Sequence, residues 1–194
     1  MIFFNVPTVS IIIAFFLSSC ADSPSHLIVA PELNLPTASK YHNKQAQLNV
    51  TDLRTARHII QMLHQGEPAE LMTSQRTLSE TIKQVLTTGF ENQGLIIKQS
   101  ADNETVNNKV EVIIDKALIS VNQKTLSYEA KSNISLRIKV INTQQTLTKT
   151  FNSRNNRIGS LIPDVAVLES DFNQQLTDAL INILTNDEVI QFIK

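Results

Sequence analysis

Cysteine is almost absent from this chain, which has 194 residues and one thiol, on Cys20. An internal disulfide needs two thiols, so a fold held together by disulfides is excluded. Tryptophan is missing, and glycine occurs only four times, at widely separated positions. A phosphate-binding loop and a nucleophile elbow both depend on clustered glycines. Gly159-Ser160 lacks the second glycine of such an elbow, so neither kind of site is expected.

The chain also lacks an excess of charge of either sign. Lysine and arginine together number 17 and aspartate and glutamate 18, which gives a net charge of −1. Without a basic stripe, nucleic acid is not an expected partner. Hydrophobic residues make up 42% of the chain, and this length suits one domain with a sizeable core. The composition therefore predicts a single globular domain with a polar surface.

The strongest signal in the sequence surrounds Cys20. An apolar run at residues 11–17 is followed by Ser18-Ser19-Cys20. This order resembles the bacterial lipobox, in which the cysteine is lipidated and becomes the new N-terminus. The apolar core is about nine residues long, whereas about 20 are needed to span a bilayer. We therefore expect residues 1–19 to be a removable signal peptide and Cys20 to carry acyl chains.

Residues 1–9 contain no lysine or arginine, although a typical leader has a basic residue before its apolar core. One alternative is that translation starts elsewhere. The other is a buried N-terminal strand that contains an ordinary cysteine.

Ala21 follows the cysteine, and Asp22 comes only after it. In enterobacterial-type lipoproteins an aspartate directly after the cysteine favours the inner membrane. The resemblance to them therefore implies the periplasmic face of the outer membrane. Residues 20–26 form the lipidated cysteine and a short polar tether, and an extended chain reaches about 3.3–3.6 Å per residue. We therefore expect the domain to lie close to the bilayer.

Two stretches have apolar residues at helical spacing. The first helix is expected to begin at Thr73 or Ser74 and to end at Gly94. Its apolar stripe consists of Leu78, Ile82, Val85, Leu86 and Phe90. The second is expected from about Asp164 to Leu184, with the stripe Leu168, Phe172, Leu176, Leu180 and Leu184. A short amphipathic tail follows at residues 188–194.

Alternating apolar and polar residues predict strands at 110–115, 126–140 and 147–151, joined by turns near Asn122 and Asn142. Further strands are expected at 27–30, 48–52 and 95–98, whereas residues 57–63 suit either a strand or a helix. Residues 27–194 are therefore expected to form a single periplasmic α+β domain. The expected architecture is a two-layer sandwich, in which two amphipathic helices cover one face of an antiparallel meander sheet. The other face of the sheet is polar.

Several segments together resemble the YajG family of small bacterial lipoproteins. They are the lipobox, Ile28-Val29-Ala30-Pro31, Leu33-Asn34-Leu35-Pro36, Val50-Thr51-Asp52-Leu53-Arg54, the helix at 78–94 and the ending Phe192-Ile193-Lys194. The resemblance covers nearly the whole chain after Cys20 and depends on the order and spacing of these segments. It implies an envelope lipoprotein of unestablished biochemical role. The family has no known catalytic residues, so none are assigned here.

Residues that could carry chemistry are few. His26, His42, His58 and His64 do not have the spacing of a metal site, so no metal or cofactor is expected. Glu111 and Asp115 are the best pair of carboxylates on one strand face, but their alternation with apolar residues is typical of a solvated face. Asp52, Arg54 and Arg57 form a charged cluster outside regular alternation. They are a candidate interaction surface, with a salt bridge or turn cap as the alternative.

The sequence favours a binding or assembly module of the cell envelope that is not an enzyme. The membrane would be bound through the lipid on Cys20. An envelope protein, lipid or glycan would be bound through the polar sheet face or by strand addition at an open edge. The alternatives are an envelope enzyme acting on peptidoglycan or lipid, and a purely structural envelope protein.

Overall fold

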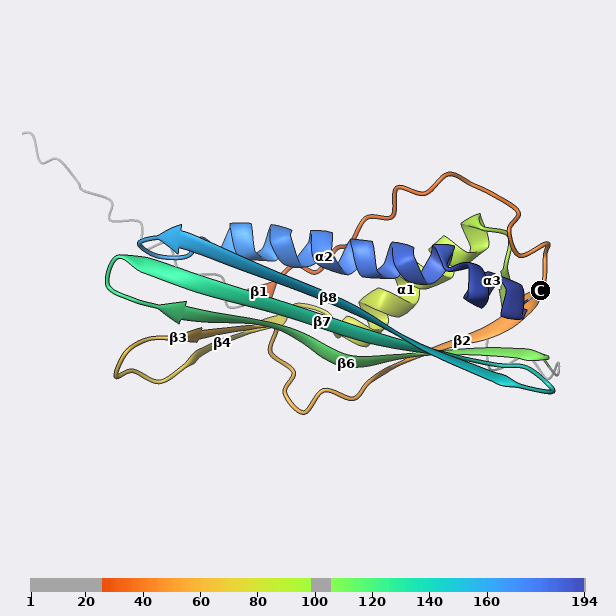
Figure 1. The fold of residues 1–194 in the computed structure, drawn as a ribbon, viewed down its shortest axis with the longest axis horizontal. Coiled ribbons are helices and arrows are strands. Elements are labelled where there is room, and N and C mark those ends of the chain that lie inside the picture. The colour runs from red at the N-terminus through yellow and green to blue at the C-terminus, as the bar shows by residue number, and fades with distance from the viewer. Residues whose placement is uncertain (1–25, 99–105, 194) are drawn as a thin grey trace, which may run out of the picture.

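A computed structural model describes residues 26–98 and 106–193. It is a mixed α+β fold in which a long, curled sheet is covered on one face by three helices (Figure 1). The signal peptide at 1–19 and Cys20 lie outside the described residues, so their predicted roles stay predictions. Among the described residues, no helix is both long enough and apolar enough to cross a membrane.

The centre of the sheet is a meander of three long strands. These are β6 (Asn108–Gln123), β7 (Ser127–Ile141) and β8 (Thr146–Ser160), and each pairs with the next in antiparallel fashion. Even-numbered residues of β7 from Tyr128 to Val140 are buried, because they point toward the helices. The predicted meander is confirmed, although β8 continues well beyond the expected end at residue 151.

The sheet as a whole is not the predicted antiparallel meander. The strands β2 (Gln45–Asp52) and β3 (Ile60–Leu63) both run parallel to β6 and share one of its edges. β2 occupies the first half of that edge, up to the pair Asp52–Ile114, and β3 begins at the pair Ile60–Ile119. Alternation in a sequence reveals a strand but neither its partner nor its direction, so these parallel pairings were not predicted.

Three short strands complete the sheet. β5 (Ile96–Lys98) lies parallel to β2, β4 (Glu70–Ser74) lies antiparallel to β3, and β1 (His26–Leu27) lies parallel to β4. β4 occupies the place where the first helix was expected to begin, so the predicted cap at Thr73 or Ser74 is wrong. Thr77 is the N-cap instead, and its hydroxyl oxygen accepts a hydrogen bond from the Glu80 amide at 3.4 Å.

The helices are α1 (Leu78–Asn92), α2 (Val165–Thr185) and α3 (Asp187–Ile193). The amphipathic tail is thus a third helix, where two were predicted. α1 packs over β2 and β5, whereas α2 packs over β7 and β8 (Figure 1). Their predicted stripes supply much of the helical side of the core, and each fully buried leucine contributes about 1.5–3 kcal/mol. Gly89 lets α1 approach α2, because a Cβ there would collide with the side chains of Leu33 and Leu184.

Candidate functional site

The long strand β6 is interrupted near its middle by a β-bulge. Its register with β7 shifts between Ile114 and Lys116, which leaves Asp115 as the extra residue. Arg137 on β7 holds this carboxylate with two hydrogen bonds, of 3.0 and 2.7 Å. These bonds and the charge of Asp115 raise the pKa of Arg137. Before the bulge the even-numbered residues of β6 are buried, and after it the odd-numbered ones are.

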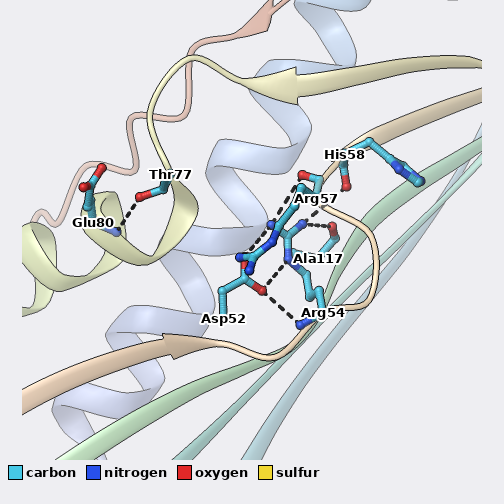
Figure 2. Close-up of polar contacts among 7 residues, drawn as sticks. All are labelled: Asp52, Arg54, Arg57, His58, Thr77, Glu80 and Ala117. Carbon is cyan, nitrogen blue, oxygen red and sulfur yellow. Dashed lines mark hydrogen bonds and ion pairs between the residues drawn. The ribbon is translucent and has the colours of Figure 1, made fainter.

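The opposite edge of β6 has a gap at the same level, where β2 ends and β3 has not begun. The Leu53 amide donates to Ile114 O at 3.1 Å, and the Ile119 amide donates to Ile59 O at 2.7 Å. Between these bonds the backbone ladder is broken. The Arg54 guanidinium fills the break, since Nη1 donates to Ala117 O at 3.0 Å and to His58 O at 3.3 Å (Figure 2).

Asp52 holds this arginine in position. Its carboxylate accepts hydrogen bonds from the Arg54 Nε at 3.0 Å, from Nη2 at 2.9 Å and from the Arg54 amide at 3.1 Å. The side chains of Asp52 and Arg54 are only 4% and 6% exposed. Burial by itself would raise the pKa of Asp52. The hydrogen bonds from Arg54 and the charges of Arg54 and Arg57 together outweigh burial, so the pKa is lowered.

The structure therefore brings the predicted trio Asp52, Arg54 and Arg57 together. Arg57 Nη1 lies 2.9 Å from the Asp52 carboxylate, but its side chain is 66% exposed. Asp52 and Arg54 form a buried ion pair that connects two strands and a loop, whereas the Arg57 side chain is exposed to solvent. Arg54 and His58 also line a hollow of about 420 Å³ on the outer face of the sheet, together with Lys116, Lys131 and Asn133. The trio as an interaction surface stays a prediction.

The two candidate carboxylates on β6 are not placed for joint catalysis. Glu111 and Asp115 are four strand residues apart, which corresponds to about 13 Å. Paired glycosidase carboxyl groups lie at most about 9.5 Å apart. Each also has a basic neighbour, since Asp115 is bound by Arg137 and Glu111 lies 3.8 Å from Lys139. Within residues 26–98 and 106–193, no group of three or more histidine, cysteine or acidic side chains is arranged to hold a metal.

A larger groove, of about 530 Å³, lies between residues 28–35 and α1. Apolar side chains such as Leu33 and Val85 line it beside the polar Gln84 and Arg76. Gln93 helps to hold the extended segment, because its Nε2 donates to Pro36 O at 2.8 Å. This groove was not predicted, because it exists only where an irregular segment lies across a helix.

The outer edge of the sheet is β8, which pairs only with β7 among the described strands. At one end the Leu161 amide donates to Leu126 O, and at the other the Asn142 amide donates to Gln145 O, both at 3.1 Å. These two bonds place the odd-numbered residues of β8 in the hydrogen-bonded pairs with β7. The even-numbered residues therefore direct their N–H and C=O groups away from β7, toward the open edge.

Comparison with known proteins identifies the family. Residues 31–194 match a family described as uncharacterized lipoprotein. The chain belongs to this lipoprotein family. No curated protein sequence matches it.

Solved structures resemble this lipoprotein in fold alone. A protein from Xanthomonas campestris has 13% identity and a TM-score of 0.57, over 87% of this chain and 94% of that one. A homolog of neuraminyllactose-binding hemagglutinin from Helicobacter pylori has 8% identity and a TM-score of 0.51, over 87% of this chain and 96% of that one. At these identities the similarity shows a shared architecture.

Proposed function

We propose that this protein is a YajG-type lipoprotein anchored to the periplasmic face of the outer membrane through Cys20. The lipobox around Cys20 and the lipoprotein family support the anchor, and Ala21 supports the choice of membrane. Each buried CH₂ group of an acyl chain contributes about 0.8 kcal/mol, and two or more chains make attachment effectively permanent. The tethered domain is a non-catalytic binding and assembly module of the cell envelope.

The open edge of β8 is the observation that carries this function. Proteins usually protect a sheet edge with short strands, prolines or bulges. β8 has 15 residues, contains no proline and keeps an unbroken register with β7. Such a long, regular edge is a ready template for a further strand. We infer that an extended segment of an envelope protein pairs with β8, since backbone hydrogen bonds along an edge give affinity.

The side chains on the outward-bonding positions indicate the kind of strand that fits. These positions are Thr146, Thr148, Thr150, Asn152, Arg154, Asn156, Ile158 and Ser160. Threonine pairs well across strands with threonine or serine through hydrogen bonds between their hydroxyl groups. Arg154 is the charged member of this set, so an acidic residue in the partner strand is favoured opposite it.

The test removes one outward N–H group without disturbing the pairing with β7. Asn152→Pro does this, because proline is tolerated on an edge strand where the N–H faces away from the ladder. Asn152→Ala is the matched control, since it changes the same side chain and keeps the N–H. A photoreactive amino acid at Thr150 reports on the partner in intact cells. A second probe at Lys139, on the outer face of β7, distinguishes the edge from the face.

We expect a crosslinked product from Thr150 that survives Asn152→Ala and is lost in Asn152→Pro. Thermal unfolding of both variants checks that the fold is retained. Strand addition is refuted if the product persists in Asn152→Pro, or if only the probe at Lys139 crosslinks.

A further inference from the structure

Exposed apolar side chains gather at one end of the domain, which we call the tip. It consists of Leu126, Ile158, Leu161 and Ile162, whose exposed fractions run from 62% to 75%. Leu126 and Leu161 are joined by a backbone hydrogen bond of 3.1 Å, and the adjacent residues Ser127 and Ser160 are paired. The β6–β7 turn, the end of β8 and the start of α2 lie together at this end (Figure 1).

The tip is held in its exposed position by the backbone. Leu161 has φ = +61°, in the left-handed region that side chains other than glycine rarely adopt. Pro163, two residues further on, is buried, and Asp164 caps α2 by accepting a hydrogen bond from the Ala166 amide at 2.9 Å. Backbone strain of this kind costs about 1–3 kcal/mol and is typical of functional positions. A polar residue would suit an ordinary solvent-exposed turn better than leucine and isoleucine do.

The first described residues of the chain run from this end of the domain along α2. The Ile28 amide donates to the Glu169 carboxylate at 2.8 Å, and the Ala30 amide donates to Asn173 Oδ1 at 3.0 Å. Residues 28–30 therefore run alongside α2 in its own direction. Followed back toward Cys20, the chain heads for the first turn of α2. Glu169 is only four residues beyond Val165, or about 6 Å along the helix axis.

Chain length then limits how far the tip can be from the membrane. Cys20 precedes His26 by six residues, which reach at most about 22 Å when extended. Acyl chains on Cys20 would thus hold this end of the domain against the bilayer. The opposite end, where β5 pairs with β2, is about 50 Å away along the 16 residues of β6.

We propose that the tip is a membrane-docking surface, whose four apolar side chains insert into the phospholipid interface that holds the acyl chains on Cys20. This inference rests on the lipid anchor of the proposed function. Because the anchor already concentrates the domain at the bilayer, a small apolar contact is enough to fix its orientation. Lys124, in the exposed β6–β7 turn, then meets the anionic headgroups. The sheet then extends away from the membrane, and the edge of β8 before Ile158 stays accessible to a partner strand.

The absence of tryptophan makes the docking directly measurable. Leu161→Trp and Ile162→Trp each place one fluorophore at the tip, and the second variant avoids the strained position. Ile96→Trp is the matched control, because Ile96 is also an exposed apolar residue but lies on β5 at the far end. The lipidated protein is reconstituted into vesicles of phosphatidylethanolamine and phosphatidylglycerol, with and without brominated acyl chains. Flotation reports on anchoring in the same samples.

With protein floating alongside the vesicles, we expect a blue-shifted emission from both tip variants. Brominated lipid should cause about a twofold loss of their fluorescence, since interfacial side chains lie about 5–10 Å deep. Ile96→Trp should show neither change. If the protein floats with the vesicles but brominated lipid does not quench the tip variants, the docking surface is overturned and the anchor is unaffected. If the emission is blue-shifted without vesicles and is not quenched by brominated lipid, the tip contacts a second copy of the protein. This result also overturns membrane docking. Failure to float contradicts the anchor itself.

Discussion

The guanidinium of Arg54 and the carbonyl oxygen of Ala117 lie 3.0 Å apart, across the gap between two strands that share an edge of β6. A side chain here takes the place of a backbone N–H in the sheet ladder. The arrangement depends on Asp52, which binds the same guanidinium through both carboxylate oxygens. A buried ion pair and a break in a sheet are thus one structural feature.

Removing this arginine should destabilise the fold strongly. Arg54→Ala leaves the Asp52 carboxylate buried without its partner and the Ala117 carbonyl without its donor. Breaking a buried pair costs about 3–5 kcal/mol of unfolding free energy. Arg57→Ala is the control, because that side chain is largely exposed and such pairs contribute about 0–1 kcal/mol. Urea denaturation of both variants measures the difference, and equal losses would contradict the assigned roles.

The lowered pKa of Asp52 predicts how stability depends on pH. A carboxyl group with a lowered pKa in the folded state stabilises the fold above its unfolded value, which is ordinarily 3.8. That contribution is lost as the pH falls through the lower, folded value. The gap in unfolding free energy between the wild-type protein and Asp52→Asn should therefore be largest near pH 7 and shrink below about pH 4. Denaturation curves over this range provide the measurement. A gap that stays constant would show that ionisation of Asp52 contributes nothing.

Gly159 should not tolerate a side chain. A Cβ at this position would collide with the ring of Tyr128, its cross-strand partner on β7. We expect Gly159→Ala to destabilise the fold by about 1–3 kcal/mol, as overpacking usually does. Combining it with Tyr128→Ala should cost less than the sum of the two single changes, since the collision is then removed. Additive costs in this double-mutant cycle would refute the contact.

The anchor predicts where a cysteine variant is found in the cell. Cys20→Ala should abolish lipidation, leaving the protein soluble or unprocessed. Fractionation of cells that express the variant and the wild-type protein at equal levels compares their membrane-bound shares. Unchanged membrane association of Cys20→Ala would mean that something other than the lipobox holds the protein.

Much of the meander was visible in the sequence, because alternation over more than ten residues can hardly be produced by anything but a half-buried strand. The bulge also left a trace. Asp115-Lys116 places two polar residues in succession, and the buried set changes there from even positions to odd ones. That change of phase could have been recognised before the structure was known. The cluster of Asp52, Arg54 and Arg57 was predicted as a group, whereas the burial of Asp52 and Arg54 was not.

The parallel part of the sheet could not be predicted in the same way. β4 (Glu70–Ser74) has only Met72 buried, so its pattern is too weak to mark a strand. The pairing of β2 with β6 joins residues about 60 positions apart, and no local signal specifies it. The burial of Arg54 follows from that pairing, since the gap it fills exists only once β2 and β3 share one edge.

Mass spectrometry of the protein purified from membranes of its native host measures the lipid anchor on Cys20 itself. We expect the mature chain to begin at Cys20 and its N-terminal peptide to carry the added mass of two or three acyl chains. An unmodified Cys20 with residues 1–19 still attached would contradict the anchor and, with it, the membrane-facing tip.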